Sequence, residues 1–320
     1  MAGRSLRLIF FGTPAFAVPT LDALVRSRHT VLAAVMQPDR PQGRGHQVHE
    51  GEVKRFAREH DLLTLQPERI RTPELLDAIR ALGADLGIVA AYGKILPEGL
   101  LQLPPLGMVN VHASLLPRYR GAAPVHRAVI AGETETGVTI MRVVPALDAG
   151  PMLANASRPI GPDDTSDVVE RDLAEIGARL LVDTVDRLAD GPIEEIEQDD
   201  GAATYAARLT RHDSPLDWTH TARTLHNQVR GLHPWPLAST SLHGRRFIIR
   251  RTAVEESASR SAPGTIVEAA GERLCVATGD GMLRVLELQP EGKRAMATRD
   301  FLAGHGVAPG AQFDAPAPRP

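Results

Sequence analysis

The stretch ADLGIVAAYGKILPEGLLQLPPLGMVNVHAS, residues 84–114, contains two short apolar runs joined by a Pro-containing connection. The runs ADLGIVAAYG (84–93) and GMVNVHAS (107–114) contain β-branched residues and lack the strict alternation of a half-exposed strand. Runs of this kind are typical of parallel strands that are covered on both faces. They predict a parallel sheet at the centre of the fold.

The segments before residue 84 alternate between strand-like and helix-like patterns. Buried strands are predicted at LRLIFFG (6–12) and TVLAAVMQ (30–37), and helices at FAVPTLDALVRS (16–27), EVKRFAREHD (52–61) and TPELLDAIRALG (72–83). This alternation predicts an α/β fold with a Rossmann-like, doubly wound, mostly parallel sheet. Ligands bind such sheets at the carboxyl ends of the strands. The loop GTPAFAVPTL after the first strand has one glycine, so it matches neither the dinucleotide fingerprint nor the Walker A loop.

The second half of the chain changes character twice. TSDVVERDLAEIGARLLVDTVDRLADG (165–191) predicts the longest amphipathic helix, and an acidic, Gly/Ala-rich segment of poor periodicity follows it. Beyond residue 210, the turn signals HGRR, APGT, AAGER, TGDGM and PEGKR separate short strand candidates, which predicts a small β-barrel. The predicted organisation is a first domain over 1–190, a linker over 191–209, a barrel domain over 210–315 and a disordered tail over 316–320.

The composition is that of a soluble globular protein, with 43% hydrophobic and 23% charged residues and no membrane-length apolar run. We therefore expect no membrane partner. The net charge of −3 argues against a general nucleic-acid binder, but basic residues outnumber acidic ones after residue 210. The single cysteine, Cys275, excludes an internal disulfide and a cysteine-rich zinc site. A cytoplasmic location is the expectation.

Three polar residues alternate along NVHAS, at Asn110, His112 and Ser114, and alternation places them on one face of a strand. Asn110 and His112 can both donate a hydrogen bond to one oxygen, as the developing oxyanion of an acyl transfer requires. Asp148, in the Gly/Pro-rich loop PALDAGPML, offers the carboxylate that would orient or deprotonate. Taken alone, the histidine and the aspartate are more often structural; together with Asn110 they favour a catalytic site.

Other catalytic signatures are absent from the sequence. There is no GxSxG nucleophile elbow and no His-Glu-x-x-His zinc helix, and the twelve histidines show no metal-ligand spacing. The pattern therefore favours acyl transfer by direct attack, with neither covalent nor metal catalysis, and we expect no metal.

NVHASLLPRYRGAAP (110–124), with Asp148 in LDAG 36 residues after His112, resembles the folate-dependent formyltransferases. Their pattern is Asn-x-His-x-Ser-Leu-Leu-Pro followed by Arg-Gly and a later catalytic Asp. The similarity extends from FFGTPAFAVPTLDAL (10–24) through AAYGKILP (90–97) to PEGKRAMATRDFL (290–302). It implies 10-formyltetrahydrofolate as the formyl donor. It specifically implies the branch whose acceptor is the α-amine of methionine esterified to initiator tRNA.

The resemblance also implies roles for individual residues. Asn110 and His112 would bind the formyl oxygen, and Asp148 would position His112 and help to remove the amine proton. Four residues would line the folate site: Ser114, Leu115, Leu116 and Pro117.

The same resemblance implies tRNA contacts from the loop QPDRPQGRG (37–45), through Arg40 and Arg44, and from Lys54. The barrel would be OB-like and would bind the tRNA backbone, and the protein would act as a monomer. After GRG, however, this chain continues HQVHEGEVK (46–54), where the family commonly has several lysines. Fewer charges mean fewer phosphate contacts and a shallower salt dependence.

Two alternatives remain at this point. One is a folate-dependent enzyme that formylates a sugar-nucleotide or other small amine, which the basic loop and the barrel disfavour. The other is a folate- or RNA-binding protein without catalysis, which the intact set of Asn110, His112 and Asp148 disfavours. Trp218 and Trp235 are expected to pack in the core or between domains rather than to stack on bases.

Overall fold

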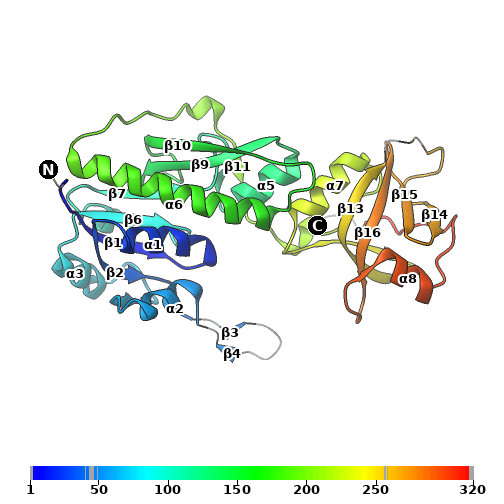
Figure 1. The fold of residues 1–320 in the computed structure, drawn as a ribbon, viewed down its shortest axis with the longest axis horizontal. Coiled ribbons are helices and arrows are strands. Elements are labelled where there is room, and N and C mark those ends of the chain that lie inside the picture. Colours follow the sequence, from blue (N-terminus) through cyan, green and yellow to red (C-terminus); the bar gives the residue numbers. More distant parts are fainter. Residues whose placement is uncertain are drawn as a thin grey trace. The chain divides into compact units, whose positions relative to one another are not determined.

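The computed structural model describes residues 3–39, 41–42, 47–48, 50–255, 257 and 259–316, and they form two compact units (Figure 1). The first unit comprises residues up to 124, 135–159 and 170–206. The second comprises 125–134, 160–169 and the chain from 207 onward. Arg40, Arg44 and residues 317–320 of the predicted tail lie outside the described residues.

The first unit is built on a seven-stranded sheet of order β10-β9-β7-β6-β1-β2-β5. Its strands are β1 (Arg7–Gly12), β2 (Thr30–Val35), β5 (Thr64–Leu65), β6 (Leu86–Ala90), β7 (Met108–His112), β9 (Glu135–Arg142) and β10 (Met152–Pro159). The five strands from β7 to β5 run parallel, whereas β9 and β10 are antiparallel to their neighbours. All five residues of β6 are buried, as its unbroken apolar sequence predicts. The predicted α/β class with a mostly parallel sheet is confirmed.

The helices of this unit follow their sequence signals. They are α1 (Val18–Val25), α2 (Glu52–Glu59), α3 (Pro73–Leu82), α4 (Glu98–Leu101) and α6 (Ser166–Asp190), whose first residues belong to the second unit. Thr72 caps α3 by accepting a hydrogen bond from the Leu75 N–H, at 3.4 Å. The helix stops at Gly83, whose φ of 62° is left-handed and favours glycine.

Helix α6 packs closely on the sheet because it carries a glycine at the contact. A Cβ on Gly177 would lie 2.8 Å from Val111 of β7 and 3.2 Å from Val138 of β9. Because adjacent residues of a strand point to opposite faces, α6 covers the face of β7 opposite to the one that carries Asn110 and His112.

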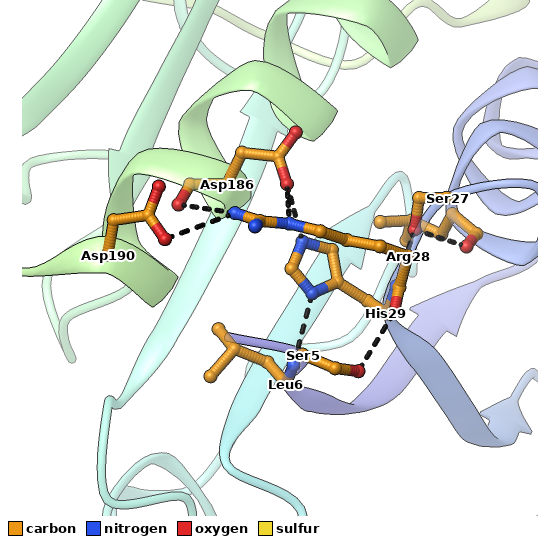
Figure 2. Close-up of polar contacts among 8 residues, drawn as sticks. Ser5, Leu6, Ser27, Arg28, His29, Asp186 and Asp190 are labelled. Carbon is orange, nitrogen blue, oxygen red and sulfur yellow. Dashed lines mark hydrogen bonds and ion pairs between the residues drawn. The ribbon is translucent and has the colours of Figure 1, made fainter. Parts of the chain in front are cut away.

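The C-terminal end of α6 is tied to the loop between α1 and β2, as Figure 2 shows. Arg28 pairs with Asp186 and Asp190, and the buried His29 ring lies between Asp186 and the backbone of Leu6. The His29 Nδ1 accepts the Leu6 N–H at 3.1 Å. Burial lowers the pKa of His29, so its ring is neutral in the folded protein at neutral pH.

Two short strand pairs complete the first unit. β3 (Pro41–Gln42) pairs with β4 (Gln47–Val48), and β8 (Arg120–Gly121) pairs in parallel with β11 (Tyr205–Ala206). The segment 191–206, inside the predicted linker, thus contributes a strand to this unit.

The second unit contains an antiparallel sheet of order β12-β13-β16-β15-β14, with β17 on β16. Its elements include α5 (Pro124–Ala131), α7 (Ala222–Gly231), β12 (Ala238–Leu242), β13 (Arg245–Glu255), β14 (Ile266–Ala270), β15 (Arg273–Ala277), β16 (Met282–Pro290), β17 (Met296–Ala297) and α8 (Thr298–Gly304). Short strands divided by turns were predicted here, and an antiparallel sheet is what they form.

The two tryptophans, both in this unit, differ from each other. Trp218 is buried, stacks on Phe313 with ring centroids 5.2 Å apart, and donates its Nε1–H to Thr240 at 3.0 Å. Packing is confirmed for Trp218. Trp235 is 52% exposed, so it is not a core residue. Along the described chain, no helix has the length and apolarity to cross a membrane.

Candidate active site

The end of strand β7 presents two polar side chains. The burial pattern along Met108–His112 is unbroken except at Asn110, which is half-buried, and His112 is buried. Because side chains two residues apart share a face, Asn110 and His112 point the same way. Within the described chain, the Asn110 side chain has no hydrogen-bond partner, so its amide can donate to a substrate oxygen.

The strand ends at His112, so the third alternating residue has a different role. Ser114 lies in the following turn, where its hydroxyl donates to the Arg118 carbonyl at 2.7 Å. Its own carbonyl accepts the Thr139 hydroxyl at 2.8 Å. Ser114 therefore shapes the turn through buried bonds rather than presenting a hydroxyl beside Asn110 and His112.

His112 is held by the turn that follows it. Its Nε2 lies 3.0 Å from the Tyr119 carbonyl. A carbonyl can only accept, so Nε2 carries a proton and, in the neutral ring, Nδ1 carries a lone pair. Tyr119 presents that carbonyl from a left-handed backbone conformation, with φ of 60°. Such a conformation costs about 1–3 kcal/mol and persists only where the surroundings hold it.

Asp148 faces the free nitrogen of His112. Its Oδ2 lies 3.7 Å from Nδ1, which is longer than a hydrogen bond, and the same oxygen accepts the Gly121 N–H at 2.8 Å. Asp148 also has a left-handed backbone, with φ of 47°. A carboxylate at this distance stabilises a proton that arrives on Nδ1, because the imidazolium then faces a negative charge in a mostly buried site.

A second segment, distant in sequence, holds this arrangement together. Gln198 donates from Nε2 to the carbonyls of Asp148, at 2.9 Å, and Gly150, at 2.7 Å. Thr204 accepts the Tyr119 N–H on its hydroxyl at 2.9 Å and the Arg120 N–H on its carbonyl at 2.8 Å. The two residues with left-handed backbone are thus fixed from outside.

Arg120 belongs to the same scaffold. It is buried, and it donates from Nε to Gln198 at 3.0 Å and from its terminal nitrogen to Asp200 at 2.7 Å. Gln198 and Thr204 were not predicted from the sequence as site residues. Their segment is acidic and without periodicity, and its contacts run largely through backbone groups that leave no sequence signature.

The residues predicted to line the folate site lie in the turn that follows β7 in the sequence. Leu116 is buried and its N–H donates to the Thr139 hydroxyl at 3.2 Å, whereas Leu115 and Pro117 are half-buried. Half-buried apolar side chains next to Asn110 and His112 fit a flat, partly apolar group.

Of the three residues predicted to contact tRNA, the structure describes only Lys54. Arg40 and Arg44 lie outside the described residues. Lys54, on α2, forms a close, hydrogen-bonded ion pair with Asp39. The hydrogen bond from Lys54 is the main cause that lowers the pKa of Asp39, and burial offsets it in part. Among the described residues, no group of three or more His, Cys, Asp or Glu side chains could hold a metal ion.

Comparisons with known proteins cover nearly the whole chain. Residues 6–185 match the formyl transferase family and residues 208–306 match the formyl transferase C-terminal domain. The methionyl-tRNA formyltransferase of Pelobacter propionicus is 48% identical over 312 residues, which span 97% of this chain and 96% of that protein. The chain belongs to the methionyl-tRNA formyltransferase family.

Solved formyltransferase structures share the fold at much lower identity. An N-formyltransferase from Helicobacter canadensis, in complex with folinic acid and dTDP-3-aminofucose, aligns with a TM-score of 0.65 at 16% identity, over 88% of this chain and 98% of that one. HypX from Aquifex aeolicus, in complex with tetrahydrofolic acid, aligns with a TM-score of 0.61 at 15% identity, over 93% and 47% of the two chains. The sugar-nucleotide alternative rests on fold alone and is not favoured over the family assignment.

Proposed function

We propose that this enzyme transfers the formyl group of 10-formyltetrahydrofolate to the α-amine of methionine esterified to initiator tRNA. The observation that carries the proposal is the convergence of Asn110, His112 and Asp148 at the end of β7, in a chain 48% identical to a methionyl-tRNA formyltransferase. The product would be N-formylmethionyl-tRNA, used to initiate translation.

The reaction needs an oxyanion donor and an acceptor for one proton. The amine attacks the formyl carbon, the carbonyl oxygen becomes negative, and the Asn110 amide donates a hydrogen bond to it. The bond from the formyl carbon to N10 of the folate then breaks, and N10 takes up a proton as the amine loses one. No covalent enzyme intermediate is required.

The resemblance also implied a hydrogen bond from His112 to the formyl oxygen, but its Nε2–H is directed at the Tyr119 carbonyl, so we assign proton transfer to His112 and Asp148 instead. With Nε2 donating to the Tyr119 carbonyl, the Nδ1 lone pair can accept the amine proton, directly or through water, and Asp148 then faces the imidazolium. A free α-amine has a pKa of about 7.7–8.0, and esterification lowers it, so the nucleophile is already neutral near pH 7.5. A modest base is therefore enough.

The remaining assignments also belong to this proposal. Ser114, Leu115, Leu116 and Pro117 would border the folate, and Arg40, Arg44 and Lys54 would contact tRNA phosphates. Residues 1–190 would carry the chemistry, and 210–315 would bind tRNA as an OB-like barrel. The segment 191–209 would connect them and also supplies β11 to the first unit. The enzyme would work as a monomer in the cytoplasm, where aminoacylated tRNA is consumed.

A parallel transfer assay tests the acceptor. Labelled formyl from 10-formyltetrahydrofolate is offered with methionyl-initiator tRNA in one reaction and with a sugar-nucleotide amine in the other. We expect product on the tRNA alone, and a rate at limiting tRNA that falls as salt is raised, because phosphate contacts are screened. Product on the small amine alone would contradict the proposed acceptor.

A further inference from the structure

Tyr205 is a large aromatic side chain that the fold leaves 69% exposed. A single exposed apolar residue needs no explanation by itself. Tyr205 is different because of the strand that carries it: β11 pairs in parallel with β8, and Tyr205 is the Cα partner of Arg120.

The neighbours of Arg120 hold both proton-handling groups of the site. On one side, the Tyr119 carbonyl accepts from His112 at 3.0 Å; on the other, the Gly121 N–H donates to Asp148 at 2.8 Å. Paired strands lie about 4.8 Å apart, so the backbone of Tyr205 stands one strand away from the residues that fix the catalytic side chains.

The backbone of this segment is firmly held although the Tyr205 ring is exposed. Thr204 makes two hydrogen bonds to the 119–120 backbone, and the Ala206 carbonyl accepts the N–H groups of Ala122, at 3.0 Å, and Ala123, at 3.2 Å. An aromatic ring on a rigid, exposed strand loses little freedom when a ligand stacks on it. Positive charge comes from the segment with which β11 pairs, where the Arg118 guanidinium is exposed and lies 5.4 Å from the Tyr119 ring centroid.

The structure of the acceptor substrate indicates which group could contact the Tyr205 ring. The reacting amine belongs to an amino acid esterified to the ribose of the 3′-terminal nucleotide, and it must approach the formyl carbon to about 3–3.5 Å. The terminal base is therefore held within one nucleotide of the site. Unpaired bases are bound by stacking on aromatic side chains, beside cations that contact the backbone.

We propose that Tyr205 is the stacking platform for the 3′-terminal base of the acceptor tRNA, and so positions the aminoacyl end at the Asn110–His112–Asp148 site. This inference rests on the proposed function. Tyr205 is a positioning residue: it touches the base of the nucleotide whose ribose carries the amino acid, and it takes no part in proton transfer.

The test compares two variants on two substrates. The substrates are methionyl-tRNA and the same methionylated RNA ending in an abasic ribose. Tyr205→Ala removes the ring, and Tyr205→Phe keeps it. Leu63→Ala, at a site in the first unit that is 50% exposed, is the control for loss of an exposed apolar side chain.

We expect Tyr205→Ala to raise the KM for methionyl-tRNA about 10- to 100-fold, the range that base stacking supplies. The KM for 10-formyltetrahydrofolate and the melting temperature should not change. Tyr205→Phe and Leu63→Ala should behave as wild type, and Tyr205→Ala should make no difference on the abasic substrate.

Two results would overturn the inference while leaving the proposed function standing. One is a KM for methionyl-tRNA that Tyr205→Ala leaves unchanged; the other is an equal loss on the abasic and the complete substrate. Failure of the wild-type enzyme to formylate methionyl-tRNA at all would instead overturn the proposed function, and this inference with it.

Discussion

His112 is placed by its two ring nitrogens rather than by its position on the strand alone. Nε2 donates to a backbone carbonyl at 3.0 Å, and Nδ1 faces a carboxylate at 3.7 Å. The first contact sets the tautomer of the ring. The second becomes an ion pair only after the ring has taken up a proton. The Asn110 side chain, in contrast, makes no hydrogen bond within the described residues, so its amide can donate to the developing oxyanion. The roles of these neighbouring residues are therefore separable by substitution.

Removing the Asn110 amide should slow the chemical step. We expect Asn110→Ala to lower kcat by about 10²–10³, as loss of one oxyanion donor does elsewhere. The KM values for both substrates should change little, because the bond strengthens in the transition state. Steady-state kinetics measure this, with the exposed Asn155→Ala on β10 as the matched control. A kcat within threefold of wild type would remove Asn110 from the mechanism.

Neutralising Asp148 should lower kcat without changing the fold. In Asp148→Asn, the side-chain carbonyl can still accept the Gly121 N–H, but the charge that faces His112 is gone. We expect kcat to fall by about 10²–10⁴ with an unchanged melting temperature. Equal activity of the two proteins across the pH range would show that the charge is not used.

At the scale of elements, the site depends on the pairing of β8 with β11. Each strand has only two residues, but Thr204 directly precedes β11 and Gln198 lies a few residues before it. Thr204 holds the left-handed backbone of Tyr119, and Gln198 holds that of Asp148. The strain at those residues persists because this segment fixes it.

Gln198→Ala should therefore act on catalysis from outside the reacting groups. It removes two hydrogen bonds to the loop of Asp148, at a cost of about 1–2 kcal/mol in stability. We expect a fall in kcat of about tenfold or more, together with a lower melting temperature. Gln289→Ala removes a similar bond, to the Lys293 carbonyl in a turn of the second unit, and should leave kcat unchanged. A wild-type kcat for Gln198→Ala would show that the loop holds itself.

Sequence reasoning identified the parts of this site that depend on local pattern. The apolar run of β7 and its alternating Asn110 and His112 are visible within five residues, and a motif gave Asp148. The side-chain contacts of Gln198 and Thr204 join residues 48 to 85 positions apart, and each has as its partner a backbone group that any residue carries. A two-residue strand shows no alternation, so composition suggested a linker where β11 forms. Trp235 looked like a packing residue by type, although the chain leaves it exposed.

At the scale of the whole molecule, each unit contains a buried histidine that must stay neutral. Burial lowers the pKa of His29 in the first unit and of His226 in the second below the ordinary value of about 6.5. The unfolded chain then binds more protons than the folded one just below pH 6.5. Stability is fully present above pH 6.5 and falls as the pH drops from there toward the folded pKa values, by up to about 1.4 kcal/mol per pH unit for each histidine.

The melting temperature should therefore fall with acidification below about pH 6.5. The Nε2 of His226 donates to the Pro162 carbonyl at 2.9 Å. The variant His226→Gln cannot take up a proton at this position, so its melting temperature should fall less steeply with acidification. The exposed His220→Gln in the same unit is the control and should leave the slope as in wild type. Scanning calorimetry from pH 5 to 8 measures both. An identical slope in all three proteins would show that His226 does not contribute.

Formyl transfer to the tRNA depends on the side chains at the end of β7. The most direct measurement is single-turnover transfer of labelled formyl to methionyl-initiator tRNA by the wild-type enzyme and by His112→Ala, with circular dichroism to show that both are folded. We predict rapid product from the wild type and a rate at least about 10²-fold lower from the variant. A folded His112→Ala protein that transfers formyl at the wild-type rate would contradict the assignment of this site.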